Sequence, residues 1–180
     1  MEKILPDHAL LSSNYREQLR EIHSSTEWGN TGKDYWEYID KIASDIGVRS
    51  FLDYGAGHGS LKKRLQQELP EKYKVKEYEP GIEEKSSRPN PSRLVVCCDV
   101  LEHVEPTLID NVLDELKRVT LEKGFFTVSC QLANRKLPDG RNAHLIVEPV
   151  SWWQTKIEER FKILKVADDV TGGTFLVEPL

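Results

Sequence analysis

The chain has 180 residues, of which 38% are hydrophobic and 31% charged, and its formal net charge is −5 at pH 7. This length suits one domain with a substantial core. The acidic balance argues against a wholly basic nucleic-acid-binding surface, and no apolar run approaches the ~20 residues of a membrane span. We therefore expect a single domain over residues 1–180, with N-terminal helices or a lid in residues 1–47 and the core in residues 48–180.

The N-terminal octet and the cysteines indicate the compartment. The octet M-E-K-I-L-P-D-H is too short and too charged for a secretory signal. Cys97, Cys98 and Cys130 show no metal-ligand spacing, and adjacent cysteines rarely bridge each other. They are expected to be buried thiols in a reducing compartment, so we predict a cytoplasmic protein without a membrane anchor.

Two helices are predicted ahead of the first strand, over Asn14–His23 and Lys33–Ile46. The second carries an apolar stripe at helical spacing and ends at Gly47. Between them lies the polar loop Ser24–Gly32, which contains Trp28. This tryptophan either covers the core or belongs to a lid over a ligand, since loops with a large aromatic side chain often close sites.

A strand, a glycine turn and a helix follow directly. Ser50–Asp53 is a short apolar run, and Ser60–Leu69 has leucines at four-residue intervals, the period of a helix. Gly55, Gly57 and Gly59 lie between them. A strand that turns through glycines into a helix is the ligand-cradling unit of α/β proteins, because a glycine backbone can approach a ligand closely.

Two cofactors fit such a turn. A nicotinamide dinucleotide places its pyrophosphate on a helix N-terminus, and the small Ser60 leaves that glycine spacing possible. S-adenosylmethionine instead presents a sulfonium, an ammonium and a carboxylate. Asp53, which comes before the first glycine, suits the ammonium and would repel a pyrophosphate.

The second strand is predicted over Tyr73–Tyr78 and is followed by Glu79. An acid at this position, about 20 residues beyond the glycines, meets a ribose diol in dinucleotide-binding folds. The placement fits either cofactor, and a surface carboxylate beside a turn is the alternative. The polar segment Ile82–Ser92 has no strand pattern, so the third strand of such a fold is short or absent.

The remaining elements alternate as in an α/β sheet. Arg93–Cys98 is an unbroken apolar run, the mark of a strand covered on both faces. Gln131–Val147 is a loop too long to be idle in a compact domain. The other predicted elements are a helix over residues 108–119, the strand Gly124–Cys130, the helix Pro149–Arg160, and an antiparallel pair formed by Phe161–Ala167 and Thr174–Glu178.

Three motifs together resemble the class I S-adenosylmethionine-dependent methyltransferases. They are D-x-G-x-G-x-G from Asp53 to Gly59, Glu79-Pro80 after the second strand, and C-C-D-V-L-E-H-V from Cys97 to Val104. The resemblance runs from about Lys33 to the C-terminus. It implies a Rossmann-like three-layer αβα sandwich whose mostly parallel sheet has the strand order 3-2-1-4-5-7-6, with the seventh strand antiparallel.

The resemblance also implies roles for individual residues. Asp53 and the backbone of Tyr54, Gly55, Ala56, Gly57 and Gly59 would hold the methionine end of the cofactor. Glu79 would bind the ribose hydroxyls, and the backbone of Cys98 and Asp99 would line the methyl side. Ile82–Ser92 lacks the acid that contacts adenine in the family, so backbone groups alone are the expected substitute.

The D-V-L-E-H segment supplies the candidate catalytic residues Asp99 and His103, and His144 is a third candidate on the long loop. His103 is a candidate general base. If a helix begins at Asp99, then Asp99, Glu102 and His103 share one face and could bind Mg²⁺ or another divalent metal, with His144 completing the set. Ubiquinone-pathway O-methyltransferases and small-RNA 3′-terminal 2′-O-methyltransferases resemble this stretch and use a related metal site. Other relatives need no metal. In those proteins the glutamate and histidine of this motif help to start a helix and pack against their neighbours.

The substrate is expected above the sheet. The candidate substrate-binding residues are Trp28, Tyr35, Arg135, Asn142, His144 and Trp153. Arg135, Lys136 and Arg141 in one loop either favour an anionic acceptor or form a solvated basic loop. The sequence thus predicts methyl transfer to an oxygen or nitrogen of a small-molecule or nucleotide-like acceptor, an RNA end included. The alternatives are a catalytically silent cofactor-binding subunit and a nicotinamide-dependent oxidoreductase.

Overall fold

The computed structural model describes residues 9–26 and 28–180, so the N-terminal octet, where no secretory signal was expected, lies outside it. The strands are β1 (Ser50–Tyr54), β2 (Lys74–Tyr78), β3 (Ser92–Cys98), β4 (Thr120–Ser129), β5 (Phe161–Asp168) and β6 (Gly172–Pro179). The helices are α1 (Ser13–Ser25), α2 (Trp36–Asp45), α3 (Ser60–Glu68), α4 (Ile109–Val119) and α5 (Val150–Glu158). Four short 3₁₀ turns accompany them: η1 (Thr31–Tyr35), η2 (Glu83–Lys85), η3 (Leu101–His103) and η4 (Pro106–Leu108).

The strands form one six-stranded sheet in the order β2-β1-β3-β4-β6-β5. β1, β2, β3 and β4 are parallel, whereas β6 runs antiparallel between β4 and β5. This is the predicted order with the third strand removed. The chain passes from β2 to β3 through residues 79–91, where η2 is the one regular element. The predicted fold class and the missing third strand are therefore confirmed.

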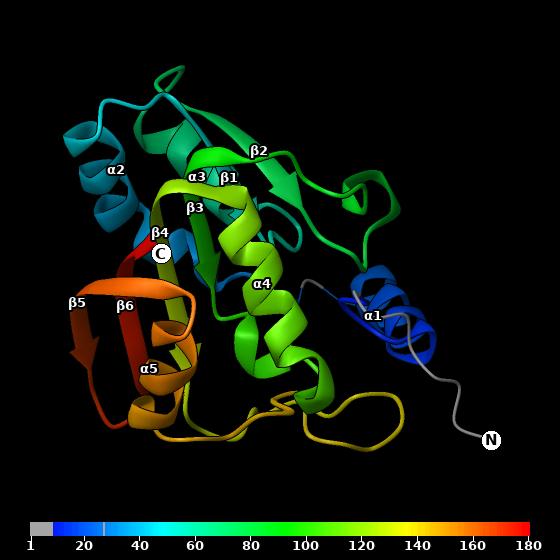
Figure 1. Ribbon diagram of the computed structural model, residues 1–180. Coiled ribbons are helices and arrows are strands. Elements are labelled where there is room, and N and C mark those ends of the chain that lie inside the picture. The colour runs from blue at the N-terminus through cyan, green and yellow to red at the C-terminus, as the bar shows by residue number, and fades with distance from the viewer. Residues whose placement is uncertain (1–8, 27) are drawn as a thin grey trace.

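Helices cover both faces of the sheet and give the expected three layers. Leu61 and Leu65 of α3, with Ile39 of α2, pack on one face against Phe51 of β1. On the other face the hydrophobic stripe of α4 and the buried side of α5 pack against β3, β4 and β6. Figure 1 shows α4 crossing in front of the sheet. The carboxyl ends of the parallel strands are left free to form a site.

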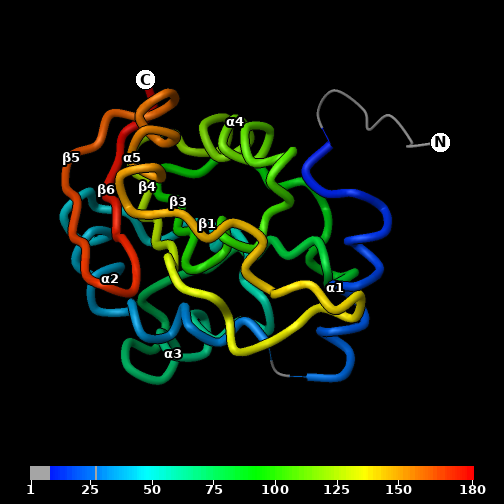
Figure 2. The backbone as a smooth tube through the Cα atoms, turned by 90° about the horizontal axis from the view of Figure 1, so that it is seen from below, coloured from blue at the N-terminus to red at the C-terminus, as the bar shows by residue number. Residues whose placement is uncertain are grey.

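A third, smaller hydrophobic cluster joins α1 to the loop of residues 131–147. Tyr15 and Leu19 of α1 pack with Leu137 and Ala143 of that loop, and the two segments run alongside each other in Figure 2. The Tyr15 hydroxyl donates a hydrogen bond to the carbonyl oxygen of His103, at 2.7 Å. The long loop is thus the platform that holds α1 beside the carboxyl ends of the strands.

None of the helices in the described part of the chain is long and apolar enough to cross a membrane.

Candidate functional site

The glycine turn binds the ends of three strands together. The backbone N–H groups of Gly55 and Ala56 both donate to the carbonyl oxygen of Tyr78, at 2.8 and 3.0 Å, which fastens the turn to the end of β2. Gly55 has φ +82°, and a Cβ there would lie 2.3 Å from Val100 Cγ2, just beyond β3. Only glycine fits this position, because the backbone is left-handed and the next strand's connection lies against it.

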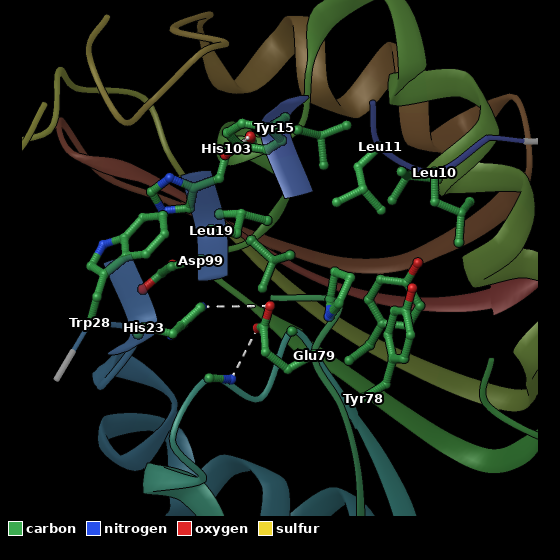
Figure 3. A pocket seen from close by; sticks show the side chains of 18 residues that line it. Leu10, Leu11, Tyr15, Leu19, His23, Trp28, Tyr78, Glu79, Asp99 and His103 are labelled. Atoms are coloured by element: carbon green, nitrogen blue, oxygen red, sulfur yellow. Dashed lines mark hydrogen bonds and ion pairs between the residues drawn. The ribbon is translucent and has the colours of Figure 1, made fainter. Parts of the chain in front are cut away.

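A cavity opens at this point and is covered by the N-terminal segment. Its lining residues are Leu10, Leu11, Tyr15, Leu19, His23, Trp28, Gly29, Tyr54, Gly55, Gly57, Tyr78, Glu79, Pro80, Asp99, Val100, His103, Val104 and Val112. Figure 3 shows Trp28, Asp99 and His103 gathered at one end, Leu10, Leu11 and Tyr78 toward the other, and Glu79 between them. The cavity is apolar along much of its length and carries carboxylates at defined points.

Glu79 is 7% exposed and is held by its neighbours. Its two carboxylate oxygens accept hydrogen bonds from the backbone N–H groups of Gly57 and Gly81, at 3.2 and 3.0 Å. Nε2 of His23, on α1, lies 3.6 Å from the carboxylate. Burial opposes ionisation, but the contacts with His23 and the two N–H groups hold the pKa of Glu79 below its ordinary value. The carboxylate is therefore charged at neutral pH.

Asp53, the penultimate residue of β1, has a different electrostatic setting. Its side chain is 4% exposed, and it does not line the cavity. Burial and the nearby Glu77 raise the pKa of Asp53 to about 7, although Lys85 opposes them. Lys85 donates hydrogen bonds to Glu77 and to the carbonyl oxygen of Gly57, so its charge is already shared. A further positive charge placed near Asp53 would lower its pKa, and the carboxyl group would then lose its proton.

Asp99 lies at the end of β3 with φ +54°, an uncommon value for a residue other than glycine. Its backbone N–H donates to Thr127, and the Thr127 hydroxyl donates to Asp99 Oδ1 at 2.6 Å. The Tyr35 hydroxyl lies 3.5 Å from Oδ2. The expected helix starting at Asp99 is wrong: the backbone turns away at Asp99, and only Leu101–His103 forms a 3₁₀ turn.

That turn changes the expected group of metal-ligating residues. Glu102, His103 and His144 each present a ligand atom, and these atoms lie within 4.8 Å of one another. Asp99 is not in this group, contrary to the prediction, because it does not share a helical face with Glu102 and His103. The long loop does bring His144 to the D-V-L-E-H segment, as expected.

Hydrogen bonds orient all three side chains. The backbone N–H of Ser129 donates to Glu102 Oε1 at 2.8 Å, while the buried Oε2 has no hydrogen-bond partner among the described residues. Nδ1 of His103 lies 2.7 Å from the carbonyl oxygen of Ala143, and Nδ1 of His144 lies 2.5 Å from that of Gln131. A carbonyl oxygen only accepts, so both Nδ1 atoms carry the proton and both Nε2 atoms keep a lone pair.

Two members of the group, Glu102 and His103, are uncharged at neutral pH as the structure stands. Burial and the nearby Asp99 raise the pKa of Glu102 to about 8. Burial lowers the pKa of His103 to about 4. A protonated carboxyl and a neutral imidazole are expected in a buried cation site that holds no metal. A metal ion that binds there displaces the carboxyl proton.

The structure separates the remaining sequence candidates. Trp28 lines the cavity and stacks edge-on against His103, with ring centroids 4.8 Å apart. Asn142 closes its own loop through Ala133 and accepts from the backbone of His144. Trp153 is 0% exposed, in the core beneath α5, so the expectation that it faces the substrate is wrong.

Some of the candidate cofactor-binding residues around the glycine turn line the cavity and others do not. Tyr54, Gly55 and Gly57 line the cavity, whereas Ala56 and Gly59 do not. Cys98 packs beneath α2 and α3 and is likewise absent from the lining.

The basic residues of the long loop lie at the protein surface. Arg135 and Lys136 are exposed, and Arg141 pairs with Asp139 at 2.7 Å. None of the three lines the cavity.

Sequence reasoning expected N-terminal helices or a lid in residues 1–47 but did not single out the residues of this segment that line the cavity. Leu10, Leu11, Tyr15, Leu19 and His23 form the covering wall of the cavity. The signal that could have found them is the spacing of Tyr15, Leu19 and Ile22, which places one apolar face on a short helix.

The sequence matches no protein-family model and no curated protein. Solved structures do resemble the fold. A 1,6-didemethyltoxoflavin-N1-methyltransferase from Burkholderia thailandensis, with bound 1,6-didemethyltoxoflavin and S-adenosylhomocysteine, is 14% identical with a TM-score of 0.61 over 98% of this chain and 93% of that one. The N-methyltransferase NodS from Bradyrhizobium japonicum WM9, in complex with S-adenosylhomocysteine, is 12% identical with a TM-score of 0.58 over 91% and 98%.

An S-adenosylmethionine-dependent methyltransferase from Aquifex aeolicus is 13% identical, with a TM-score of 0.56 over 82% of this chain and 98% of that one. The chain therefore has the fold of the class I S-adenosylmethionine-dependent methyltransferases.

Proposed function

We propose that this chain is an S-adenosylmethionine-dependent methyltransferase that moves a methyl group to an oxygen or nitrogen of a small-molecule acceptor. The observation that carries the proposal is the cavity at the carboxyl ends of β1, β2 and β3, where the glycine turn, Glu79 and Asp99 meet. In this assignment Asp53 and the glycine backbone hold the methionine end, Glu79 binds the ribose, and Asp99 marks the methyl side.

Charge in the cavity favours this cofactor over a dinucleotide. The described lining residues include Glu79 and Asp99, and neither lysine nor arginine is among them. A pyrophosphate would be repelled by these carboxylates, whereas a sulfonium and an ammonium are attracted to them. Leu10, Leu11 and Val104 supply an apolar wall for the adenine, which takes the place of the acid that Ile82–Ser92 lacks.

The N-terminal segment is proposed to act as a lid. The covered cavity has a volume of about 100 Å³, smaller than the roughly 300–1,000 Å³ of pockets for ligands of this size. We infer that α1 moves outward to admit the cofactor and packs over it afterwards. Amide hydrogen exchange in residues 13–25 should then slow when S-adenosylhomocysteine binds.

The chemistry needs mainly alignment. The acceptor lone pair forms a bond to the methyl carbon as the carbon–sulfur bond breaks, its electrons staying on sulfur to give S-adenosylhomocysteine, and the acceptor proton passes to water. Holding the two reactants in line supplies most of the acceleration. Asp99, fixed by Thr127, lies where a donor group of the acceptor would be oriented.

Glu102, His103 and His144 fit a divalent cation, which we propose as a second cofactor. The unpartnered Glu102 Oε2 and the two free Nε2 atoms supply one oxygen and two nitrogen ligands. Two imidazoles and one carboxylate suit a transition metal such as Mn²⁺ or Zn²⁺ better than Ca²⁺. A bound cation would lower the pKa of an acceptor hydroxyl and hold its oxygen.

Calorimetry and methyl transfer test the main proposal. S-adenosylmethionine and S-adenosylhomocysteine should bind the purified chain, and NAD should not. Incubation with methyl-labelled cofactor and a metabolite extract should then transfer label to a small molecule. Binding of NAD alone would overturn the assignment. Binding of S-adenosylhomocysteine without transfer into any small-molecule or RNA pool would instead support a catalytically silent subunit.

A pair of histidine variants tests the cation. His144→Ala should weaken Mn²⁺ binding, measured by calorimetry, by at least about 100-fold, because a direct ligand is lost, whereas loss of an outer-shell partner costs 10–100-fold. The control is His58→Ala, which removes a histidine outside the group. Equal Mn²⁺ affinity in the two variants, with activity unaffected by EDTA, would remove the cation from the proposal.

A further inference from the structure

A second cavity of about 350 Å³ lies beside the first, between η1, the ends of β3 and β4, and the turn that joins β5 to β6. Its lining residues are Tyr35, Asp99, Val128, Ser129, Ala167, Asp168, Asp169, Thr171, Gly172, Gly173 and Thr174. This volume falls in the range of pockets that hold small organic molecules.

Asp99 lines both cavities. Its carboxylate is anchored through Oδ1 by the Thr127 hydroxyl, at 2.6 Å, while the Tyr35 hydroxyl lies 3.5 Å from Oδ2. One fixed carboxylate therefore faces the space proposed for the cofactor and the space next to it. A molecule in the second cavity would lie at the methyl end of the first.

The second cavity is negatively charged. Asp99, Asp168 and Asp169 contribute carboxylates, and no lysine, arginine or histidine is among the described lining residues. A hydroxyl and two backbone N–H groups of its own turn donate to Asp169 Oδ1 alone. They hold the pKa of Asp169 below its ordinary value.

The turn that carries these acids is firmly placed against the sheet. Gly172 pairs with Ser129 across β4 and β6. A Cβ at Gly172 would lie 2.1 Å from the carbonyl oxygen of Val128, so only glycine permits this approach. The acids are consequently held opposite Asp99 by the sheet itself.

We propose that this second cavity is the methyl-acceptor pocket and that it selects a small molecule carrying a protonated amine. The inference rests on the proposed function and adds the chemical class of the acceptor. The amine would lie against Asp168 and Asp169, and the atom to be methylated, an oxygen or nitrogen elsewhere on the molecule, would lie near Asp99. An acceptor bearing phosphate would meet three carboxylates with no cation to offset them.

The test uses the full chain saturated with S-adenosylhomocysteine and three amine probes, namely putrescine, spermidine and glucosamine, with glucose 6-phosphate as the anionic comparison. Calorimetry or ligand-observed NMR should detect at least one amine and should not detect glucose 6-phosphate. The double variant Asp168→Asn/Asp169→Asn should weaken amine binding by about tenfold or more. The amide that replaces the Asp169 carboxylate keeps a side-chain oxygen to accept from the turn, so the cavity retains its shape.

The matched control is Asp45→Asn, which removes an exposed carboxylate of α2 outside both cavities. Affinity for S-adenosylhomocysteine should be the same in the wild-type chain and in all these variants. If the chain binds S-adenosylhomocysteine but none of the amines, or binds them equally after the double substitution, the acceptor-pocket inference is overturned. Failure to bind S-adenosylhomocysteine at all would overturn the proposed function on which it rests.

Discussion

The two cavities that meet at Asp99 are built in different ways. The polar part of the first is fixed by backbone groups: the glycine turn is bonded to Tyr78, and Glu79 is held by the N–H groups of Gly57 and Gly81. The second is made by side chains on the exposed turn between β5 and β6. Backbone contacts suit a ligand whose shape never changes, whereas a charged surface turn can be altered without disturbing the core. Under the proposed function, the cofactor would lie on one side of Asp99 and the acceptor on the other.

Gly55→Ala should break the first cavity and give the largest effect. The new Cβ would need a left-handed backbone, costing about 1–2 kcal/mol, and would overlap Val100, adding about 1–3 kcal/mol. We expect chemical denaturation to show a loss of roughly 2–5 kcal/mol of unfolding free energy. Affinity for S-adenosylhomocysteine should fall roughly 100-fold, equivalent to about 2.8 kcal/mol.

Gly140→Ala is the matched control, because Gly140 has φ +89° and nothing within 4 Å of a Cβ. It should cost only the backbone strain of roughly 1 kcal/mol and leave cofactor affinity unchanged. Amine binding in the second cavity should survive Gly140→Ala as well. Equal losses of cofactor affinity in the two variants would mean that contact with Val100 is irrelevant to the site.

A pH series should sharpen the comparison by isolating Asp53. Its pKa is raised to about 7 without the cofactor, and a nearby ammonium favours the charged carboxylate. Binding therefore expels a proton below pH 7, and affinity rises with pH until that value is passed. From pH 6 to pH 7.5, below the pKa of an α-amino group, we expect about an eightfold gain in affinity for S-adenosylhomocysteine.

Asp53→Asn should flatten that dependence and bind more weakly throughout. The substitution tests Asp53 apart from its ionisable neighbours Glu77 and Lys85. It also tests it apart from His23, which contacts Glu79, and His58, which meets His23 edge-on. A variant that keeps the full eightfold slope would assign the proton to one of those groups instead. Amine binding in the second cavity should not follow the Asp53 slope.

The part of the site made by consecutive residues could be predicted from the sequence. The strand, glycine turn and helix around Gly55 depend on local backbone geometry. The glycine positions and the spacing of apolar residues, both visible in the sequence, indicate that geometry. The missing third strand was equally visible, because Ile82–Ser92 has no run of apolar residues to bury. His144 was expected near His103 only as the residue that would complete a metal site, and the structure does bring the two rings together.

Other features depend on contacts between distant segments. Trp153 looks like a substrate-facing aromatic in the sequence, but the apolar face of α5 buries it in the core. The left-handed backbone at Asp99 is imposed by its bonds to Thr127, 28 positions later, and not by its own neighbours. The second cavity needs the β5–β6 turn to lie opposite β3, which follows from sheet order and Gly172 packing rather than from any motif.

The smallest expected effect concerns the basic loop, which the sequence offered as a site for an anionic acceptor. Arg135 contributes its carbonyl oxygen to the loop, and Lys136 forms a backbone bridge with Asn142, so both roles survive loss of the side chains. The double variant Arg135→Ala/Lys136→Ala should stay within about 0.5 kcal/mol of the wild-type unfolding free energy. Its methyl-transfer rate should change less than twofold.

Arg141→Ala provides the contrast within the same loop. Arg141 pairs with Asp139, which also accepts from Gln18 of α1, so this loss should loosen α1 and cost up to about 1 kcal/mol. That outcome, with an inert Arg135→Ala/Lys136→Ala pair, would assign the basic residues to holding the covering helix. If the double variant transferred methyl groups to a phosphorylated acceptor ten times more slowly than the wild-type chain, the acceptor would bind at this loop. The acidic cavity would then not be the acceptor site.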